Sequence, residues 1–205
     1  FPTVRIPATI VDHTDSLTNN AFTSVTASGT TGTSPVGQEV DKAFDSSTST
    51  SFRLNSGAGG GVIINLGSQR VASTLRLTTS ASNSGRDPTS FSVFGSNDGT
   101  TFTTIATNQA LSAPSGRTTA YPETDFTNSS AFQFYKITFP TVRTGGQALQ
   151  IGEIGLNSGG DVADHTEGLS TSAFTAIGGN GDVGSSPSNE RVHLAFDDNV
   201  NSKYL

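Results

Sequence analysis

An internal repeat constrains the fold of this chain more than any other feature of its sequence. Residues 11–53 align with residues 163–205 at a constant offset of 152 without a gap, and 15 of the 43 aligned pairs are identical. The matched triplets include Asp-His-Thr at 12–14 and 164–166, Ala-Phe-Thr at 21–23 and 173–175, and Ala-Phe-Asp at 43–45 and 195–197. A match of this length predicts one complete unit of about 150 residues, the usual size of a domain, and the opening third of a second unit.

The repeat divides the chain into three segments. We expect a complete domain over residues 1–158, a glycine-containing linker over residues 159–163, and the first third of a homologous domain over residues 164–205. The pentapeptide FPTVR at residues 1–5 recurs at residues 139–143. This second, shorter repeat favours a chain that belongs to a tandem array.

The composition favours an all-β fold. The chain holds 28 Ser, 30 Thr and 23 Gly, only 32% of it is hydrophobic and 14% is charged, yet 13 Phe fall at regular positions. A disordered chain of low hydrophobicity would carry a higher net charge and fewer aromatic residues. We find no apolar repeat of 3.6 residues long enough for a core helix, so short antiparallel strands are expected.

Strands are expected at five places. They are the glycine-led run 59–66, the half-buried run 71–77, a strand that starts at Phe91 and ends at the turn 95–99, and the run 131–139 with a last strand at 148–156. In the last two runs the apolar residues change from one face to the other, so each run either bulges or is buried on both faces. Regular spacing of this kind favours a sandwich of two sheets.

Charge and motifs exclude several classes of function. The net charge is −6 and the 11 Lys and Arg are scattered, which argues against nucleic acids and anionic membranes as partners. The longest aliphatic run is Val62 to Ile64, so we expect no membrane-spanning helix. There is no Cys for disulfides or thiolate metal sites, and no motif for nucleophilic or metal-dependent hydrolysis. We therefore expect a protein that is not an enzyme.

Four segments resemble, in order, a known superfamily. Residues 43–52 (AFDSSTSTSF) resemble the A-x-D-G-x-x-x-T-x-W loop of galactose-binding-like domains, and residues 61–67, 91–102 and 151–156 resemble their later strands. The superfamily includes discoidin (coagulation factor type C) domains and family 32 carbohydrate-binding modules. The resemblance implies an eight-stranded jelly-roll β-sandwich that binds glycans, lipid headgroups or proteins without catalysis.

The resemblance also implies a structural calcium ion at the first loop. Asp45, Thr50, Glu153 and the carbonyls of Ser46 to Ser49 can supply the oxygen ligands that Ca²⁺ prefers. In the second copy the corresponding candidates are Asp197, Asn199 and Ser202. Ser46 replaces the usual Gly and Phe52 replaces the usual Trp. The alternative is that Asp45 caps a turn and Glu153 pairs with an arginine.

The position of a ligand site is less clearly marked. In family 32 modules the glycan lies on loops at one end of the sandwich, against an Arg, a His or Asn, and an exposed aromatic residue. The candidates here are Arg53, Arg86 and Asn83, followed by Arg117, Arg143 and Asn55. The alternative for each is an ordinary loop residue or an ion pair, such as Arg86 with Asp87. His13, which recurs as His165, is expected to hold its loop through its ring rather than to bind a ligand.

Two functions remain open. In the first, the chain is a secreted, non-catalytic building block of an extracellular filament, array or surface layer. The apolar residues of the incomplete second unit would then pack against another copy, head to tail, or against another extracellular protein; these residues are Phe174, Leu194, Phe196 and Tyr204. In the second, the chain is a calcium-dependent carbohydrate-binding module, in which repetition raises avidity for a glycan. Both place the protein outside the cell or at its surface.

Overall fold

The computed structural model describes residues 11–158. The predicted linker and the predicted second unit lie outside these residues, so the domain boundaries and the head-to-tail contact stay predictions. The same holds for two groups of candidate residues: the second metal set Asp197, Asn199 and Ser202, and the assembly set Phe174, Leu194, Phe196 and Tyr204.

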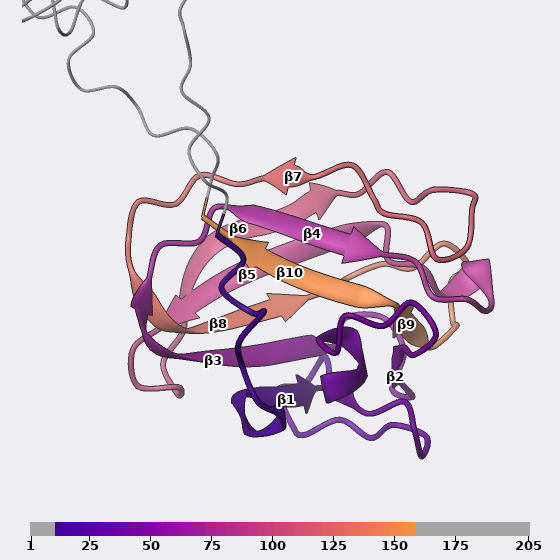
Figure 1. Cartoon of the computed structure of the whole chain (residues 1–205), viewed down its shortest axis with the longest axis horizontal. Helices are drawn as coiled ribbons and strands as arrows, with labels where there is room; N and C mark the ends of the chain where they lie inside the picture. The colour runs from indigo at the N-terminus through magenta and orange to yellow at the C-terminus, as the bar shows by residue number, and fades with distance from the viewer. Residues whose placement is uncertain (1–10, 159–205) are drawn as a thin grey trace, which may run out of the picture. The chain divides into compact units, whose positions relative to one another are not determined.

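The described domain is a β-sandwich of two antiparallel layers (Figure 1). One layer is a five-stranded sheet in the order β1 (Phe22–Val25), β3 (Gly61–Arg70), β8 (Phe132–Thr138), β5 (Ser90–Ser96) and β6 (Thr103–Ala110). The other layer holds β10 (Glu153–Asn157), β4 (Thr74–Thr78) and β7 (Thr124–Asp125), beside the pair β2 (Phe52–Leu54) and β9 (Leu149–Ile151). The predicted all-β sandwich is thus confirmed.

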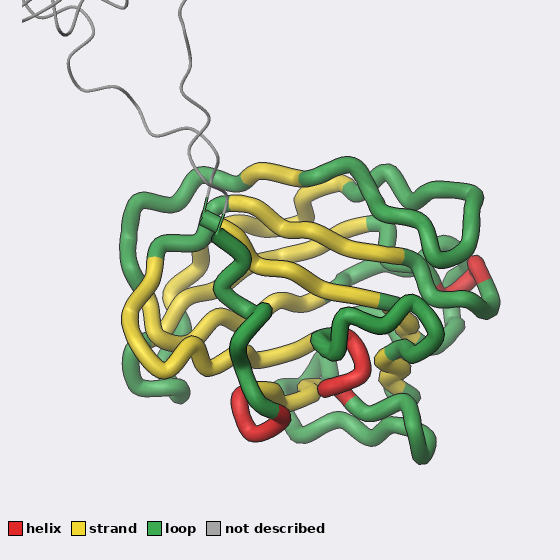
Figure 2. Tube along the Cα trace, in the orientation of Figure 1, coloured by secondary structure: helices red, strands yellow, loops and turns green. Residues whose placement is uncertain are grey.

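Loops and short helices connect the strands (Figure 2). The helices of the described domain are single 3₁₀ turns: η1 (Asn19–Ala21), η2 (Val40–Ala43) and η3 (Ser84–Arg86). None of the described helices is long and apolar enough to cross a membrane.

A single apolar core lies between the layers. Leu75 and Leu77 of β4 face it while Arg76 between them is exposed, as the two-residue period of a strand requires. Tyr135 of β8 is fully buried, and its hydroxyl donates to the carbonyl of Arg70 at 2.7 Å and accepts from the amide of Ala72 at 3.1 Å. Burial raises the pKa of this phenol, so the Tyr135 hydroxyl stays protonated and pins the β3–β4 connection to the core.

The predicted strands are largely confirmed. The run 59–66 begins as β3 at Gly61 and continues to Arg70, whereas Val71 is exposed and precedes β4. The run 131–139 forms a regular β8 with Tyr135 and Ile137 buried and the alternate residues half-buried. The irregularity lies in its partner β3, where the register shifts between Asn65 and Arg70.

In the run 148–156 the apolar residues change from one face to the other, and this change does not come from a bulge. The chain divides at Gly152 into β9, which pairs with β2, and β10, which pairs with β4. The amide of Gly152 donates to the carbonyl of Thr78 at 2.8 Å, and a Cβ at this position would lie 2.7 Å from the carbonyl oxygen of Thr79. Only glycine allows this close approach, which passes one continuous segment from one strand pair to another. The described domain contains ten strand segments rather than the eight that the resemblance implied, and the division at Gly152 accounts for one of the two additional segments.

The first copy of the Asp-His-Thr triplet, at residues 12–14, forms a turn that is bonded to β10 and to the β3–β4 connection. Oδ1 of Asp12 accepts hydrogen bonds from the amide and the hydroxyl of Thr14 at 2.8 and 2.5 Å. The His13 amide donates to the Leu156 carbonyl at 3.0 Å, and Nε2 of the ring lies 3.1 Å from the Val71 carbonyl. The ring of His13 therefore holds this segment to the β3–β4 connection, as expected.

Candidate functional site

Arg53 and Gln150 occupy opposite positions on the paired strands β2 and β9. Their neighbours along the strands, among them Phe52, Leu54 and Leu149, are fully buried in the core. Side chains alternate along a strand, so Arg53 and Gln150 both project from the face that points away from the core. Gln150 is nevertheless only 2% exposed, which means that a loop covers it.

The covering loop contains two of the predicted ligand residues. Oε1 of Gln150 accepts hydrogen bonds from the Ser82 hydroxyl and from Nη1 of Arg86, each at 3.0 Å, and Nε2 donates to the Ser51 hydroxyl at 3.0 Å. Oδ1 of Asn83 accepts from the amide of Gly85 at 2.9 Å and so caps η3. The structure therefore brings Arg53 and Arg86 to the same glutamine, while Asn83 shapes the loop between them.

Several polar atoms at this place have no partner. Nε of Arg53, Nε of Arg86 and Oε1 of Gln38 are buried without a hydrogen bond to any described residue. Gln38 belongs to the same cluster, because its carbonyl accepts from the Arg53 amide at 3.0 Å. Buried polar atoms are seldom left unpaired in native proteins, so ordered water is the expected partner of these three atoms. The side chains of Arg53 and Arg86 are only half-buried, and their exposed parts are open to a ligand.

An apolar residue stands beside this cluster. Val36 is 98% exposed in the turn that the Gln38 amide closes by donating to the Pro35 carbonyl at 3.0 Å. No aromatic residue among residues 11–158 is among the exposed large hydrophobic residues, which are Val11, Val36 and Val71. Of the three exposed large hydrophobic residues, Val36 is the one closest in sequence to Gln38, whose carbonyl accepts from the Arg53 amide.

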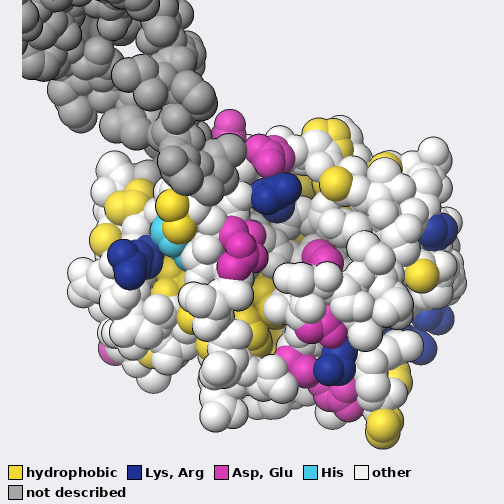
Figure 3. Space-filling model, viewed as in Figure 1, with side chains coloured by type: hydrophobic (Ala, Val, Ile, Leu, Met, Phe, Trp, Pro, Cys, Tyr) yellow, Lys and Arg dark blue, Asp and Glu magenta, His cyan; other side chains and the backbone are white. Residues whose placement is uncertain are grey.

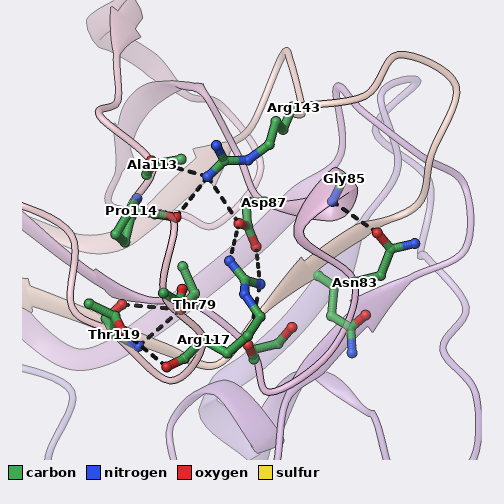
Figure 4. A network of polar contacts seen from close by, with 12 residues as sticks. Thr79, Asn83, Gly85, Asp87, Ala113, Pro114, Arg117, Thr119 and Arg143 are labelled. Atoms are coloured by element: carbon green, nitrogen blue, oxygen red, sulfur yellow. Dashed lines mark hydrogen bonds and ion pairs between the residues drawn. The ribbon is translucent and has the colours of Figure 1, made fainter.

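Arg117 and Arg143 have a structural role instead. Both nitrogens of the Arg117 fork bind the fully buried carboxylate of Asp87, with Nη1 at 2.8 Å from Oδ1, and Nη2 of Arg143 lies 3.3 Å from Oδ2 (Figure 4). Arg143 also donates to the carbonyls of Ala113 and Pro114. The predicted alternative of an Arg86–Asp87 pair is wrong, because Gln150 binds Arg86 and the other two arginines satisfy Asp87.

The first loop brings the predicted calcium ligands together. The Thr50 hydroxyl donates to both carboxylate oxygens of Asp45 at 2.8 and 3.0 Å, and the Ser47 amide donates to Oδ1 of Asp45 at 3.1 Å and to Oε1 of Glu153 at 3.0 Å. Ser46 has a φ of 56°, the left-handed region that favours the glycine found there in the family motif. Asp45 does cap a turn, but Glu153 makes no ion pair with an arginine of the described domain.

The electrostatics of this loop suit a cation. Burial, followed by the nearby charge of Asp45, raises the pKa of Glu153 to about 7. A divalent ion would relieve both effects, since it compensates the lost hydration and separates the two negative charges. Two carboxylates, a hydroxyl and the loop carbonyls form an oxygen donor set that fits Ca²⁺. This set contains only two acidic side chains, and the described residues hold no cluster of three or more His, Cys, Asp or Glu placed to bind a metal.

Sequence reasoning missed Gln150, Gln38 and Val36. Gln150 carried a usable signal, because it is the polar residue of an otherwise apolar strand, between Leu149 and Ile151. Gln38 and Val36 lie in an irregular loop, where no periodicity marks a residue as special.

Comparisons with known proteins place the fold. No family model matches the sequence, and no curated protein matches it. A solved structure of CpGH89CBM32-5 from Clostridium perfringens, in complex with GalNAc-β-1,3-galactose, aligns with a TM-score of 0.53 at 15% identity over 66% of this chain and 92% of that chain. The CBM32-1 and CBM32-2 domains of C. perfringens ZmpB, in complex with GalNAc, align with a TM-score of 0.56 at 11% identity over 73% of this chain and 36% of that chain.

A third structure extends the likeness to another organism. A selenomethionine-labelled point mutant of chitosan-binding module 1, from a chitosanase/glucanase of Paenibacillus sp. IK-5, aligns with a TM-score of 0.50 at 22% identity, over 72% of this chain and 98% of that chain. The described domain thus has the galactose-binding-like fold of family 32 carbohydrate-binding modules, as its sequence motifs implied.

Proposed function

We propose that this chain, whose described domain has the fold of family 32 carbohydrate-binding modules, is a non-catalytic glycan-binding module. The observation that carries the proposal is that the half-buried Arg53 lies opposite Gln150 in the strand pair, while the side chain of Gln150 binds the half-buried Arg86. We propose further that the protein works outside the cell or at its surface.

The chemistry of this cluster suits a sugar. A guanidinium group is a rigid fork of donors that can bind two neighbouring hydroxyl oxygens or a carboxylate of a saccharide. The half-buried Gln38 adds a side-chain amide to this cluster, and the exposed Val36 can cover an apolar sugar face. Small-ligand sites typically combine apolar surface with a few fixed polar groups in this way.

The assembly role that the sequence first favoured receives no support. It rests on the apolar residues of the segment 164–205, which lies outside the described residues. The shared fold and the half-buried arginines at Gln150 both favour the carbohydrate-binding alternative. Solved relatives of this fold are named for binding GalNAc-containing glycans or chitosan, so these glycan classes are the first to test.

We also propose a structural Ca²⁺ at the first loop, held by Asp45, Thr50, Glu153 and carbonyls of the segment 46–49. The bound ion would supply positive charge to two carboxylates that otherwise repel each other. Glu153 lies at the start of β10, so its carboxylate would fasten the loop to the sandwich.

A glycan array tests the proposed function. We expect the purified chain to bind a defined set of glycans and the Arg53→Ala/Arg86→Ala double variant to lose every glycan of that set that carries no free amino group. Arg70→Ala, which removes an exposed arginine at the end of β3, is the matched control and should bind as the parent does. A parent that binds no glycan without a free amino group, or a double variant that binds such glycans as strongly as the parent, would overturn the proposal.

A further inference from the structure

A hollow lies on the β4–β10 face of the sandwich. Its volume is about 360 Å³, within the range of small-ligand pockets. It shares no residue with the cluster around Gln150, and only Ser46 and Glu153 belong both to the hollow and to the candidate calcium loop.

The apolar lining of the hollow is held rigidly. The ring of Phe44 stacks on the ring of Phe22, with centroids 3.9 Å apart and an interplanar angle of 5°. Tyr121 is fixed at both ends, because its hydroxyl donates to the Pro88 carbonyl at 3.2 Å and its amide donates to the Leu77 carbonyl at 2.8 Å. The half-buried ring of Phe44 therefore offers apolar surface to the cavity, while Tyr121, which is 5% exposed, belongs to the core beneath it.

The hollow carries an excess of negative charge. Four carboxylates line it, and among the lining residues only Arg76 is cationic; the carboxylates are those of Asp12, Asp15, Glu123 and Glu153. Arg76 pairs with Glu123 at 3.1 Å, which leaves three carboxylates without a cation in the hollow. Figure 3 shows acidic side chains gathered around hydrophobic surface on this face. A calcium ion at the first loop would neutralise Glu153 but would leave Asp12 and Asp15.

One end of the hollow is kept open by a glycine. A Cβ at Gly155 would lie 2.5 Å from Oδ2 of Asp12 and 3.5 Å from Oδ1 of Asn157. Asn157 is fully buried, and neither atom of its amide has a hydrogen-bond partner in the described part of the chain. Glu153, Gly155 and Asn157 alternate along β10 and so share one face of the strand. The unpaired amide thus lies beside the acidic end of the cavity.

We infer that the β4–β10 hollow is a second binding site, for a saccharide unit with a free amino group. The ammonium group of such a unit would pair with the unmatched carboxylates, the sugar ring would lie against Phe44, and the sugar hydroxyls would reach the side chains of Ser46 and Thr78. A lysine side chain of a protein would satisfy the charge but would leave most of the apolar lining uncovered. The inference goes beyond the proposed function, since it needs neither Arg53 nor Arg86.

Calorimetric titration of the whole chain tests this site with a β-1,4-linked glucosamine trimer, its fully N-acetylated counterpart and a lysine tetrapeptide as probes. We expect the glucosamine trimer to bind at least about tenfold more tightly than the other two probes. The double variant Asp12→Asn/Asp15→Asn, which removes two of the unmatched charges, should weaken that binding about tenfold or more, whereas Asp41→Asn, which removes an acidic group outside the hollow, should leave it unchanged.

Variants of the Arg53/Arg86 cluster distinguish binding there from binding in the β4–β10 hollow. Arg53→Ala/Arg86→Ala should leave glucosamine binding intact even where it abolishes the binding of other glycans. The inference would be overturned if the glucosamine trimer did not bind, or if the acetylated trimer or the lysine peptide bound as tightly as it or more tightly. It would also be overturned if the arginine variant alone lost the binding of the glucosamine trimer. A shift in melting temperature on trimer addition, measured for each variant, shows that the variant is folded and supplies a second readout.

Discussion

Nη1 of Arg86 donates a 3.0 Å hydrogen bond to Oε1 of Gln150, a residue 64 positions away in the sequence. The same oxygen accepts from Ser82, so one buried amide positions both the loop and its guanidinium group. The proposed glycan site depends on this relationship, because the loop has no regular structure beyond η3 to hold it.

Replacement of this amide should reduce both stability and binding. Gln150→Leu keeps the approximate volume but leaves Ser82, Ser51 and Arg86 without their shared partner, so we expect a loss of about 1–3 kcal/mol in the free energy of unfolding. Glycan affinity should fall as well, because Arg86 is no longer fixed. Urea unfolding and calorimetry measure the two effects. Gln109→Leu, which removes an exposed glutamine bound only to the Thr107 carbonyl, is the control.

Removal of the buried carboxylate of Asp87 should be far more costly. Asp87→Ala leaves the Arg117 and Arg143 guanidinium groups without their anion, and the loss of one partner from a buried ion pair costs about 3–5 kcal/mol. Glu123→Gln breaks the exposed pair with Arg76 and should cost less than about 1 kcal/mol. Equal unfolding midpoints in urea for the two variants would contradict the role assigned to Asp87.

The division of the last strand at Gly152 predicts a sharp steric requirement. Gly152→Ala places a methyl group against the carbonyls of Thr78 and Thr79, and we expect a loss of about 1–3 kcal/mol in the free energy of unfolding. Gly145→Ala meets no atom within 4 Å and should leave the stability unchanged. Thermal unfolding of both variants measures the difference, and a stable Gly152→Ala variant would show that the junction is looser than described.

Much of the fold was predictable from the sequence, for a physical reason. Alternation of apolar residues located β4, which buries one face in the core. Apolar residues between turns located β5, which is buried on both faces, and β8, which has buried residues on one face and half-buried residues on the other. The break at Gly152 was not predictable, since an alternation that changes phase is equally consistent with a bulge or with a strand buried on both faces. The carbonyls that exclude a side chain there belong to Thr78 and Thr79, which are distant in sequence.

The site was predictable only in part. Arg53 and Arg86 were named from residue type and family resemblance, but their convergence depends on Gln150, which lies on another strand. The same limit explains the wrong Arg86–Asp87 pair: adjacency in sequence favoured it, whereas the loop fold brings Asp87 to Arg117 and Arg143. Long-range partners of loop residues are set by tertiary structure, which local patterns do not encode.

Glu153 should make the stability of the metal-free domain depend on pH. Its pKa is raised from 4.5 to about 7, first by burial and then by Asp45, so the folded state holds the proton more tightly than the unfolded state. The stability that this adds is complete below pH 4.5 and is lost as the pH rises through about 7. With chelator present, we therefore expect the melting temperature to decrease over this range.

Calcium should reverse that decrease. The ion binds the ionised carboxylate and only in the folded state, so excess Ca²⁺ above pH 7 should raise the melting temperature again. Glu153→Gln should abolish both the pH dependence and the response to calcium, while Asp41→Asn should keep them. Identical melting curves in chelator and in calcium would exclude a calcium site at Asp45, Thr50 and Glu153.

The central claim is that Arg53 and Arg86 bind a glycan, and calorimetric titration of a glycan without a free amino group, selected on the array, tests it most directly. We predict that Arg86→Ala and Arg53→Ala each weaken binding about tenfold or more, with melting temperatures close to that of the parent and with Arg70→Ala unchanged in affinity. Folded variants of Arg53 and Arg86 that bind the selected glycan with the affinity of the parent would contradict the claim.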